Sequence, residues 1–452
     1  MAKSIKKEAL AFMVSLGCPK NFVDTEVIAG SILTGGVGIT PDPEEADIYI
    51  INTCAFIPTA REEAESVIRE AIAWKKNFPK ERKIIVCGCL VQWDKDFSIR
   101  NKFKKVDLWL GIDDIPAAGS LILGALEENP KASPLPSSSP EYLYDDLTPR
   151  LQLTLPHFAY IKISEGCSNR CSYCAIPNIR GRLRSRNQDA IVKEASNLLS
   201  GGAKELILIG QDTTAYAADY GKKDSLARLL GKLDKLEGDF WLRLLYTHPA
   251  HFTNKLIETI ADSKHVLPYI DMPLQHISDT LLKSMNRKTS SKEIKKLLDK
   301  IRSAIPEIAI RTTLITGYPG ETDRDFEELL AFVKEQKFQR MGAFVYYPEP
   351  STPAASMPGQ VPPEVAAERL DTIMKAQSKI SLSFNKSLAG KVFDVIVDTA
   401  DTKHAVGRTF MDAPEIDNRV LFSGKVNPGD LVKVKITGAS EYDLKGIAAK
   451  GK

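Results

Sequence analysis

The sequence predicts a three-domain α/β protein, and three observations carry this prediction. Apolar strand-like runs alternate with amphipathic helical stretches near the N-terminus, and a second, longer alternation of the same kind fills the middle of the chain. The C-terminal segment instead contains short β-branched runs separated by turn residues. Alternating strands and helices are typical of parallel sheets covered by helices, whereas short strands with turn signals are typical of small barrels. We therefore expect a flavodoxin-like doubly wound domain, an open (β/α)6 barrel and a small all-β barrel.

The N-terminal domain is expected over residues 8–126 as a doubly wound parallel sheet. Its strand-like runs cover residues 9–15, 48–52, 83–87 and 106–110, with helical patterns at 23–33 and 59–76. Cys18, Cys54 and Cys89 each come just after one of the first three strands. Ligands of such sheets bind in the crevice beyond the carboxyl ends of the strands. We therefore expect these three thiols to converge on one point.

The central domain is expected over residues 153–384, after a linker at 127–152 that begins rich in proline and serine. Six strand-like runs lie at 159–163, 205–209, 241–245, 269–272, 309–315 and 342–346, with helical patterns between them. A closed barrel of this type needs eight βα units, so six units predict an open (β/α)6 barrel. Its active site is expected at the carboxyl ends of the strands.

The C-terminal domain is expected over residues 385–452 as a small all-β barrel. A final helical pattern at 363–384 precedes it, and β-branched runs follow at 391–398, 419–422 and 431–437. Turn residues such as the NPGD at 427–430 separate the runs. Short strands with such turns favour a compact barrel over another helix-covered sheet.

Composition narrows the class of protein further. Of the 452 residues, 43% are hydrophobic and 26% are charged, which excludes a chain that is disordered throughout. The 61 basic and 58 acidic residues leave a net charge of +3, too small to hold nucleic acid by bulk electrostatics. No apolar run is long enough to span a bilayer, so no membrane partner is expected. Without a recognisable signal segment the expected location is the reducing cytoplasm, where the seven cysteines are expected to be ligands or catalysts rather than disulfides.

Three of these cysteines form the strongest motif of the sequence, Cys167-x3-Cys171-x2-Cys174, directly after the first strand of the central domain. Three thiolates on one tight loop can hold three irons of a [4Fe–4S] cluster and leave the fourth iron open to bind a small molecule. A structural zinc site is the alternative, but such sites normally have four protein ligands. No nearby histidine or cysteine completes a set of four.

This spacing, with Tyr173 before the third cysteine, resembles the signature of the radical S-adenosylmethionine (SAM) superfamily, whose core is an open six-unit barrel. The resemblance implies that the amino and carboxylate groups of SAM chelate the open iron. An electron from the reduced cluster would then cleave SAM and produce a 5′-deoxyadenosyl radical that abstracts hydrogen from an unactivated carbon. Such a step is beyond acid–base chemistry, so no catalytic acid or base is expected.

Motifs spread over nearly the whole chain resemble those of one branch of this superfamily, the radical SAM methylthiotransferases. They are SLGCPKNFVDTE at 15–26, RGRLRSR at 180–186, QDTT at 211–214, PLQH at 273–276, TLITGYPGE at 313–321 and YPEPSTP at 347–353. The C-terminal barrel resembles a TRAM domain. In this family three N-terminal cysteines hold a second [4Fe–4S] cluster, a role that the resemblance gives to Cys18, Cys54 and Cys89. The GCL at 88–90 matches the family's Gly-Cys-Leu, which leaves Cys87 as a core residue.

The resemblance implies a two-stage transfer of a methylthio group to an aspartate of a small-subunit ribosomal protein. One SAM supplies a methyl group to sulfur associated with the N-terminal cluster, and a second SAM supplies the radical that removes a β-hydrogen from the aspartate. The carbon radical then captures the methylthio group. The implied cofactors are two [4Fe–4S] clusters and SAM. The implied partners are the ribosomal protein and a reductant protein such as flavodoxin or ferredoxin.

Further site residues are expected from their positions after the barrel strands. These residues are Gln211, Asp212, Gln275, Gly317 and Glu321. Together with Tyr173 they are the candidate SAM-binding residues. Each of these five also has a structural interpretation as part of a loop or turn. In the alternating arginines of 180–186, Arg184 and Arg186 are candidate substrate contacts, although a run of charges also fits a solvated face. The histidines at 248 and 251 are assigned no role.

The choice between a protein and a tRNA substrate depends on the C-terminal domain and on one tetrapeptide. The segment from residue 385 carries a net charge of only +2, and one of its loops holds the candidate substrate contacts Asp412, Glu415 and Asp417. Acidic groups complement a basic ribosomal protein better than they complement RNA, although they can also cap turns. Family members that modify tRNA typically have Cys-Gln-Met-Asn where this chain has CPKN at 18–21. These features favour the protein and argue against tRNA.

Two other functions stay open from the sequence alone. One is the same chemistry on an isopentenylated tRNA adenosine, which a more basic C-terminal barrel would indicate. The other is a non-catalytic iron–sulfur protein that binds RNA or assists assembly. Clusters that do not cleave SAM would indicate this second function.

Overall fold

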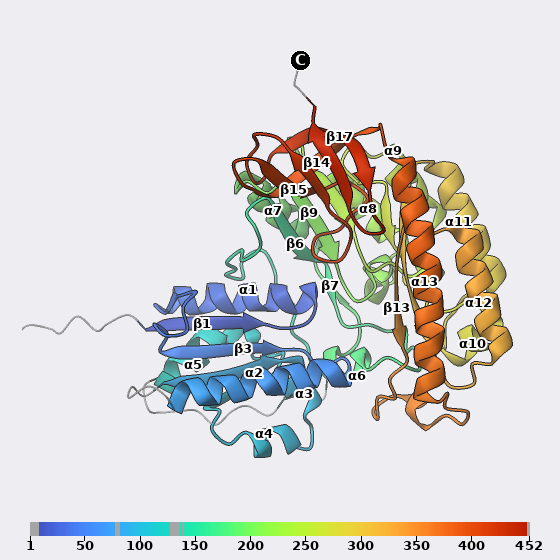
Figure 1. The fold of residues 1–452 in the computed structure, drawn as a ribbon. Coiled ribbons are helices and arrows are strands. Elements are labelled where there is room, and N and C mark those ends of the chain that lie inside the picture. Colours follow the sequence, from blue (N-terminus) through green and yellow to red (C-terminus); the bar gives the residue numbers. More distant parts are fainter. Residues whose placement is uncertain (1–8, 77–81, 127–135, 138, 450–452) are drawn as a thin grey trace, which may run out of the picture. The chain divides into compact units, whose positions relative to one another are not determined.

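The computed structural model describes residues 9–76, 82–126, 136–137 and 139–449, and Figure 1 shows their fold with many of the helices and strands labelled. The chain forms two compact units. The first contains the described residues up to Leu153 together with Lys162–Ser168 and Cys174–Ile191, and the second contains Thr154–Ile161, Asn169–Tyr173 and the chain from Val192 onward. The chain therefore crosses between the units within the cysteine motif, and the predicted domain limits stay a prediction.

The first unit contains a parallel sheet of five strands in the order β2-β1-β3-β4-β5. Their bounds are β1 Leu10–Ser15, β2 Gly38–Ile39, β3 Ile48–Thr53, β4 Lys83–Gly88 and β5 Leu108–Leu110. Helices α1 (Pro19–Thr34) and α2 (Pro58–Lys76) cover opposite faces of this sheet, as Figure 1 shows. The strand order is that of flavodoxin-like sheets, which confirms the predicted doubly wound fold.

Local sequence explains most of these elements. All six residues of β3 are buried, which fits a β-branched run covered on both faces by helices. Helix α1 begins directly after Cys18 with Pro19 at its first position, where a helix does not need the missing N–H. Strand β2 was not predicted, because two residues are too few to show an alternating pattern.

The remaining elements of the first unit are short. They are α3 (Cys89–Trp93), α4 (Ser98–Lys102), η1 (Ile115–Ala117), α5 (Ala118–Leu126), β7 (Ser164–Glu165), α6 (Ile176–Arg180) and β8 (Arg184–Ser185). Of the predicted linker, residues 127–135 and 138 lie outside the described residues. Residues 139–152 have no helix or strand, and they pack against α1, where the N–H of Leu151 donates to the carbonyl of Glu26 at 3.0 Å.

The second unit contains the six parallel strands that the sequence predicts. They form two sheets in chain order, β6 (Phe158–Lys162) with β9 (Glu205–Ile209) and β10 (Trp241–Leu244), and β11 (Tyr269–Asp271) with β12 (Ala309–Thr316) and β13 (Arg340–Val345). Leu242 of β10 bridges Val266 just before β11, which joins the two sheets. In the described part of the chain β13 does not pair with β6, so the barrel is open, as predicted.

Helices follow the barrel strands and cover them. They are α7 (Gln188–Ser200), α8 (Ser225–Leu233), α9 (Asn254–Asp262), α10 (Asp279–Ser284), α11 (Ser291–Ala304), α12 (Asp323–Gln336) and α13 (Pro363–Ser387), with short 3-10 turns η2 (Thr213–Ala215), η3 (Ala218–Tyr220), η4 (Pro249–His251) and η5 (Pro353–Ser356). Helix α11 shows the cause: Ile294, Leu298 and Ile301 recur at helical spacing and are buried, and Ser290 with Glu293 forms a capping box. None of the helices in the described ranges is both long and apolar enough to cross a membrane.

The C-terminal segment forms a closed barrel in the order β14-β15-β16-β18-β17, which confirms the predicted all-β domain. Its strands are β14 Val392–Ala400, β15 His404–Arg408, β16 Val420–Ser423, β17 Leu431–Ala439 and β18 Leu444–Ala448. Strands β15 and β18 were not predicted, because both are short and contain glycine. The barrel is anchored to the rest of the second unit by buried contacts such as that between Arg408 and Glu205 at 2.6 Å.

Candidate active site

Cys18, Cys54 and Cys89 lie at one edge of the five-stranded sheet. Cys18 precedes α1 after β1, Cys54 directly follows β3, and Cys89 opens α3 after β4. Because β1, β3 and β4 are neighbouring parallel strands, their carboxyl ends share this edge. Burial raises the pKa of the Cys54 thiol, and the nearby charge of Cys18 raises it further. The structure thus brings the predicted N-terminal thiols together.

Two glycines permit this close arrangement. Gly17, just before Cys18, has φ +89°, and a Cβ there would lie 2.6 Å from the Cβ of Cys54. Gly88, just before Cys89, has φ +92°, and a Cβ there would lie 2.2 Å from Oδ1 of Asn52. Only glycine tolerates both the positive φ and so close an approach. Each glycine therefore positions the cysteine that follows it.

Cys87 and Cys89 lie in different surroundings although one residue separates them. Cys87 is fully buried in β4, and its Sγ lies 3.5 Å from the carbonyl oxygen of Ile51, to which it donates. Burial raises the pKa of Cys87 far above its ordinary value. Burial also raises the pKa of Cys89, to about 12, but there the charge of Arg180 opposes it. These contacts support Cys89, not Cys87, as the third member of the thiol set.

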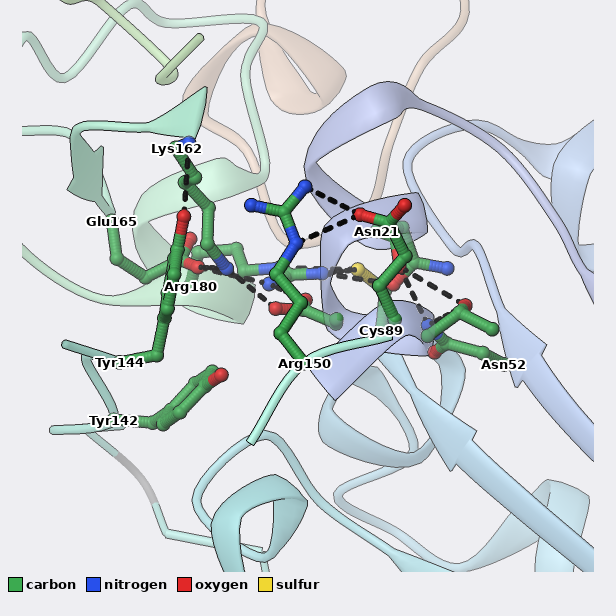
Figure 2. A network of polar contacts seen from close by, with 12 residues as sticks. Asn21, Asn52, Cys89, Tyr142, Tyr144, Arg150, Lys162, Glu165 and Arg180 are labelled. Atoms are coloured by element: carbon green, nitrogen blue, oxygen red, sulfur yellow. Dashed lines mark hydrogen bonds and ion pairs between the residues drawn. The ribbon is translucent and has the colours of Figure 1, made fainter. Parts of the chain in front are cut away.

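Figure 2 shows the polar network around Cys89. Arg180, the last residue of α6, is buried and donates from Nε and Nη2 to Cys89 Sγ at 3.3 and 3.1 Å. Its Nη2 also donates to Oδ1 of Asn21 at 3.0 Å, and its Nη1 donates to Asp24 at 2.6 Å and to Glu165 at 3.2 Å. From the sequence Arg180 is one of four alternating arginines, and nothing in that pattern indicates its contact with a cysteine.

A second buried cation, Lys162, belongs to the same network. Its Nζ contacts the carboxylate of Asp24 and lies 2.6 Å from Oε2 of Glu165. The aromatic rings of Tyr142 and Tyr144 lie 5.3 and 5.7 Å from the ammonium group, within cation–π range. Lys162 and Arg180 thus supply two positive charges opposite two carboxylates. The net charge of these four groups is zero, without any charge on Cys89.

Arg184 and Arg186, the predicted substrate contacts, have hydrogen bonds inside the first unit, and their contact with a substrate stays a prediction. Arg186 is buried, its guanidinium lies 3.9 Å from the centre of the Tyr144 ring, and Nη1 donates to the carbonyl of Lys162 at 3.0 Å. Arg184 donates to the carbonyls of Arg180 at 3.1 Å and of Arg182 at 2.8 Å. Both side chains therefore hold their own segment together.

The second predicted thiol set, Cys167, Cys171 and Cys174, lies on the loop between β7 and α6, and each of the three is partly exposed. The N–H of Cys167 donates to the carbonyl of Gly181 at 3.1 Å. Strands β7 and β8 pair antiparallel on either side of this loop. These bonds fix the base of the loop in the first unit.

In the second unit a buried arginine lies beside Cys171. Nη1 of Arg287 is 4.0 Å from Cys171 Sγ and 3.5 Å from the Tyr173 hydroxyl, and Nη2 donates to the carbonyl of Pro273 at 2.6 Å. The ring of Tyr173 packs edge-on against Tyr318, with ring centres 6.5 Å apart. Arg287 belongs to none of the motifs that the sequence indicates, so sequence reasoning missed it.

Asp212, a predicted SAM contact, is buried after β9 and engaged by its neighbours. Its carboxylate accepts hydrogen bonds from Asn169 Nδ2 at 2.7 Å, from the Thr214 hydroxyl and from the N–H of Ala215 at 3.1 Å. Gln211 stands directly before it and is half-buried. Because Asn169 lies within the cysteine motif, Asp212 connects that loop to the carboxyl end of β9.

Two histidines without a predicted role lie beside Asp212. Nδ1 of His251 is 2.8 Å from its carboxylate, and the ligand atoms of Asp212, His248 and His251 all lie within 4.8 Å of one another. Burial lowers the pKa of His248 to about 3, and its Nδ1 accepts a hydrogen bond from the N–H of Ala250 at 3.1 Å. His248 is therefore neutral and carries its hydrogen on Nε2.

Gly317 and Glu321 shape the turn after β12. The Glu321 carboxylate is buried, accepts the N–H of Gly317 at 2.8 Å and pairs with Arg369 of α13 at 2.9 Å. Gly317 has φ +74°, and a Cβ there would lie 2.3 Å from the Cβ of Ala366. Of the two interpretations left open for these residues, the contacts support the structural one.

Several buried polar atoms near the cysteine loop and after the barrel strands lack a hydrogen-bond partner among the described residues. The buried atoms Nε2 of His248, Oε1 of Gln275 and Nε of Arg287 have no hydrogen-bond partner within the described residues. Buried polar groups are normally hydrogen-bonded, so these atoms fit a polar ligand such as SAM. The donor chemistry of the two thiol sets, three sulfurs each, fits iron–sulfur clusters with one iron open.

Replacing Asp212 with asparagine should lower the pKa of His251. The hydrogen bond that His251 donates to the Asp212 carboxylate is the largest cause that raises this pKa above 6.5, and burial opposes it. The stability that this pair contributes is fully present below pH 6.5 and is lost as the pH rises through the raised pKa, so the variant should lose this dependence. Histidine NMR titration measures the shift. Asp262→Asn, at an exposed position of α9, is the control, and an unchanged His251 midpoint in Asp212→Asn would contradict the prediction.

In the acidic loop of the C-terminal barrel, two of the three predicted contacts are engaged by neighbouring groups. Asp412 is fully buried and accepts from Nε of Arg340 at 2.8 Å, and Asp417 accepts from the Tyr269 hydroxyl at 2.6 Å. Only Glu415 of the three is exposed, at φ +67°. The carboxylates of Asp412 and Asp417 thus bind groups inside the second unit, and contact of these two residues with a substrate stays a prediction.

Models of known families match three parts of the chain. They are described as the radical SAM superfamily at residues 161–333, the uncharacterized protein family UPF0004 at residues 11–111, and the TRAM domain at residues 389–448. Among solved structures, the radical SAM methyltransferase TsrM from Kitasatospora setae is 13% identical, with a TM-score of 0.56 over 77% of this chain and 74% of that chain. The cobalamin-dependent radical SAM enzyme OxsB is 12% identical, with a TM-score of 0.51 over 83% of this chain and 56% of that chain. These two likenesses show a shared fold.

Curated relatives are much more similar. Proteins named ribosomal protein uS12 methylthiotransferase RimO are 44% identical in Clostridium botulinum, over 96% of this chain and 97% of that protein, and 43% identical in Geotalea uraniireducens, over 99% of both. The one from Pelotomaculum thermopropionicum is 44% identical over 96% of this chain and 98% of its own length. Identity at this level over nearly the full length shows common membership, and the chain therefore belongs to the RimO family of radical SAM methylthiotransferases.

Proposed function

We propose that the protein adds a methylthio group to the β-carbon of an aspartate in ribosomal protein uS12. A C–S bond replaces one C–H bond of the substrate, and the aspartate carboxylate is unchanged. The observation that carries this proposal is the presence, in one RimO-family chain, of two sets of three thiols at the carboxyl ends of two parallel sheets. Each set offers three cysteines, one fewer than the four protein ligands usual for a structural metal site.

Two [4Fe–4S] clusters and SAM are the cofactors, and when bound they supply sulfur, the methyl group and the radical. Cys167, Cys171 and Cys174 would hold the cluster that binds SAM, and Cys18, Cys54 and Cys89 would hold the auxiliary cluster. The unpartnered atoms of His248, Gln275 and Arg287 would bind polar groups of SAM. Asp212 holds the middle of the cysteine loop through Asn169 and acts on SAM only by this support.

The partners follow from the same chemistry. Radical formation needs one electron from outside the chain, and we propose a flavodoxin-type or ferredoxin-type reductant as its source. We propose that the reaction takes place in the cytoplasm, where ribosomes are assembled, and that the protein is preferred over tRNA as the substrate. Of the predicted acidic-loop contacts, the exposed Glu415 is the most accessible to the basic ribosomal protein.

Mass spectrometry of reconstituted reactions tests this function. Protein loaded with iron and sulfide, supplied with SAM and a reductant under anaerobic conditions, should convert uS12 to a product in which one methylthio group replaces one hydrogen, located on an aspartate by fragmentation. Isopentenylated tRNA in the same reaction should stay unchanged. uS12 with the target aspartate replaced by alanine is the control. Methylthiolated tRNA with unmodified uS12 would contradict the proposal, and clusters that never cleave SAM would indicate a non-catalytic protein.

A further inference from the structure

The guanidinium of Arg180 uses all five of its N–H donors inside the first unit. Two point to one acceptor, the Sγ of Cys89, at 3.3 and 3.1 Å, and the other three go to the side chains of Asn21, Asp24 and Glu165. Asn21 and Asp24 are in turn held by α1, whose start follows Cys18. Figure 2 shows Arg180 between Glu165 and Cys89.

This arrangement is suited to a sulfur that carries negative charge. A thiol is a weak acceptor, whereas a thiolate accepts short, charge-assisted hydrogen bonds. A cysteine sulfur bound to iron carries negative charge, and two donors of a permanently charged guanidinium converge on Cys89 in the way such a sulfur requires. Among the described residues, Arg180 is the arginine bonded to a sulfur of the N-terminal set.

Arg180 also belongs to the other cysteine motif by its place in the chain. It ends α6 six residues after Cys174, and its partner Glu165 lies two residues before Cys167. Lys162 contacts Glu165 and Asp24 and so supports the same arrangement from the other side. Arg180, which follows the radical SAM motif, thus donates both hydrogen bonds to Cys89, and Glu165, which precedes the motif, helps to hold Arg180 in place.

We propose that Arg180 is a positioning residue of the auxiliary cluster: it orients Cys89 as a ligand and raises the cluster's reduction potential. Hydrogen bonds to ligand sulfur stabilise the more negative, reduced state of an iron–sulfur cluster. Loss of the two N–H···S contacts therefore makes the potential more negative. This inference rests on the proposed function for the identity of the cluster.

The test uses the full chain with Cys167, Cys171 and Cys174 replaced by alanine, so that only the auxiliary cluster is loaded. In this background, Arg180→Lys keeps the positive charge but presents its donors from one nitrogen, which cannot hold Cys89, Asp24 and Glu165 together. EPR-monitored redox titration should give a more negative potential than with Arg180, and iron analysis should give fewer irons per chain. Arg182→Lys, at an exposed position of the same run, should match the parent in both. An unchanged potential and iron content in Arg180→Lys would overturn the proposal.

A second measurement needs no substitution at Arg180. It therefore tests whether Arg180 contacts the auxiliary cluster even if Arg180→Lys does not fold. With arginine labelled by 15N, pulsed EPR of the reduced auxiliary cluster should show a 15N hyperfine coupling from the guanidinium, and its absence would overturn the proposal. The two proposals fail differently. A chain of this background that binds no iron contradicts the proposed function, whereas bound iron with a potential independent of Arg180 contradicts only the role of Arg180.

Discussion

Replacing Cys54 with alanine should abolish methylthiolation of uS12 while SAM is still cleaved to 5′-deoxyadenosine. Cys54 lies at the sheet edge with Cys18 and Cys89, and sulfur transfer is assigned to this set. The radical is assigned to the other set, so Cys167→Ala should lose 5′-deoxyadenosine formation completely. Because methylation of sulfur needs no radical, Cys167→Ala should still form S-adenosylhomocysteine, and Cys54→Ala should not.

Chromatography with mass spectrometry measures both nucleosides and the uS12 product in one anaerobic reaction. Cys87→Ala is the matched control, because Cys87 is a cysteine close to the same site whose thiol faces the sheet interior. It should retain both SAM reactions and the uS12 product. Equal loss of 5′-deoxyadenosine in Cys54→Ala and Cys167→Ala would contradict the division of labour between the two sets.

The largest loss of stability is expected for Glu205→Ala. Glu205 is fully buried and accepts from Nε of Arg243 at 2.6 Å and from Nη1 of Arg408 at 2.6 Å. Alanine leaves Arg243 buried without its carboxylate partner. Removal of one partner from a buried ion pair typically costs about 3–5 kcal/mol of unfolding free energy. Asp394→Ala breaks an exposed pair with Lys433 and should cost less than about 1 kcal/mol.

Urea unfolding followed by 19F NMR of fluorotryptophan-labelled protein measures this loss, because Trp241 reports on the second unit next to Glu205. The pH dependence has a definite sign. Burial alone would raise the pKa of Glu205, but the charges of Arg408 and Arg243 hold it below 4.5. The stabilisation by Glu205 is therefore full above pH 4.5 and is lost as the pH falls through the lower pKa. Equal urea midpoints for Glu205→Ala and Asp394→Ala at neutral pH would contradict the prediction.

Fold class could be predicted from the sequence because the periodicity that indicates it is local. The run at Glu205–Ile209 shows its burial in its own five residues, and the observed β9 has the predicted bounds. Strands β2, β15 and β18 are too short or too rich in glycine for such a signal. Their places depend on the neighbours with which they pair, and those neighbours are distant in the sequence.

In the candidate site, too, some features could be predicted from local sequence and others depend on distant contacts. The grouping of Cys18, Cys54 and Cys89 could be expected, because the carboxyl ends of adjacent parallel strands always share one edge. The contact of Arg180 with Cys89 spans 91 residues and depends on how one loop packs against the sheet. Acidic character alone was a poor guide to exposure, since Asp412 is neutralised by Arg340 inside the second unit.

The anchoring of the C-terminal barrel limits how enzymes of this family can be recombined. Its residues Arg408 and Asp412 have their charge partners, Glu205 and Arg340, on strands of the radical SAM barrel. A TRAM barrel grafted from a relative that lacks counterparts of Arg408 and Asp412 would leave Glu205 and Arg340 buried without their charge partners. A chimera that takes only residues 385–452 from such a relative should therefore fold poorly. A functional graft must also replace the residues of the radical SAM barrel that pair with the TRAM barrel.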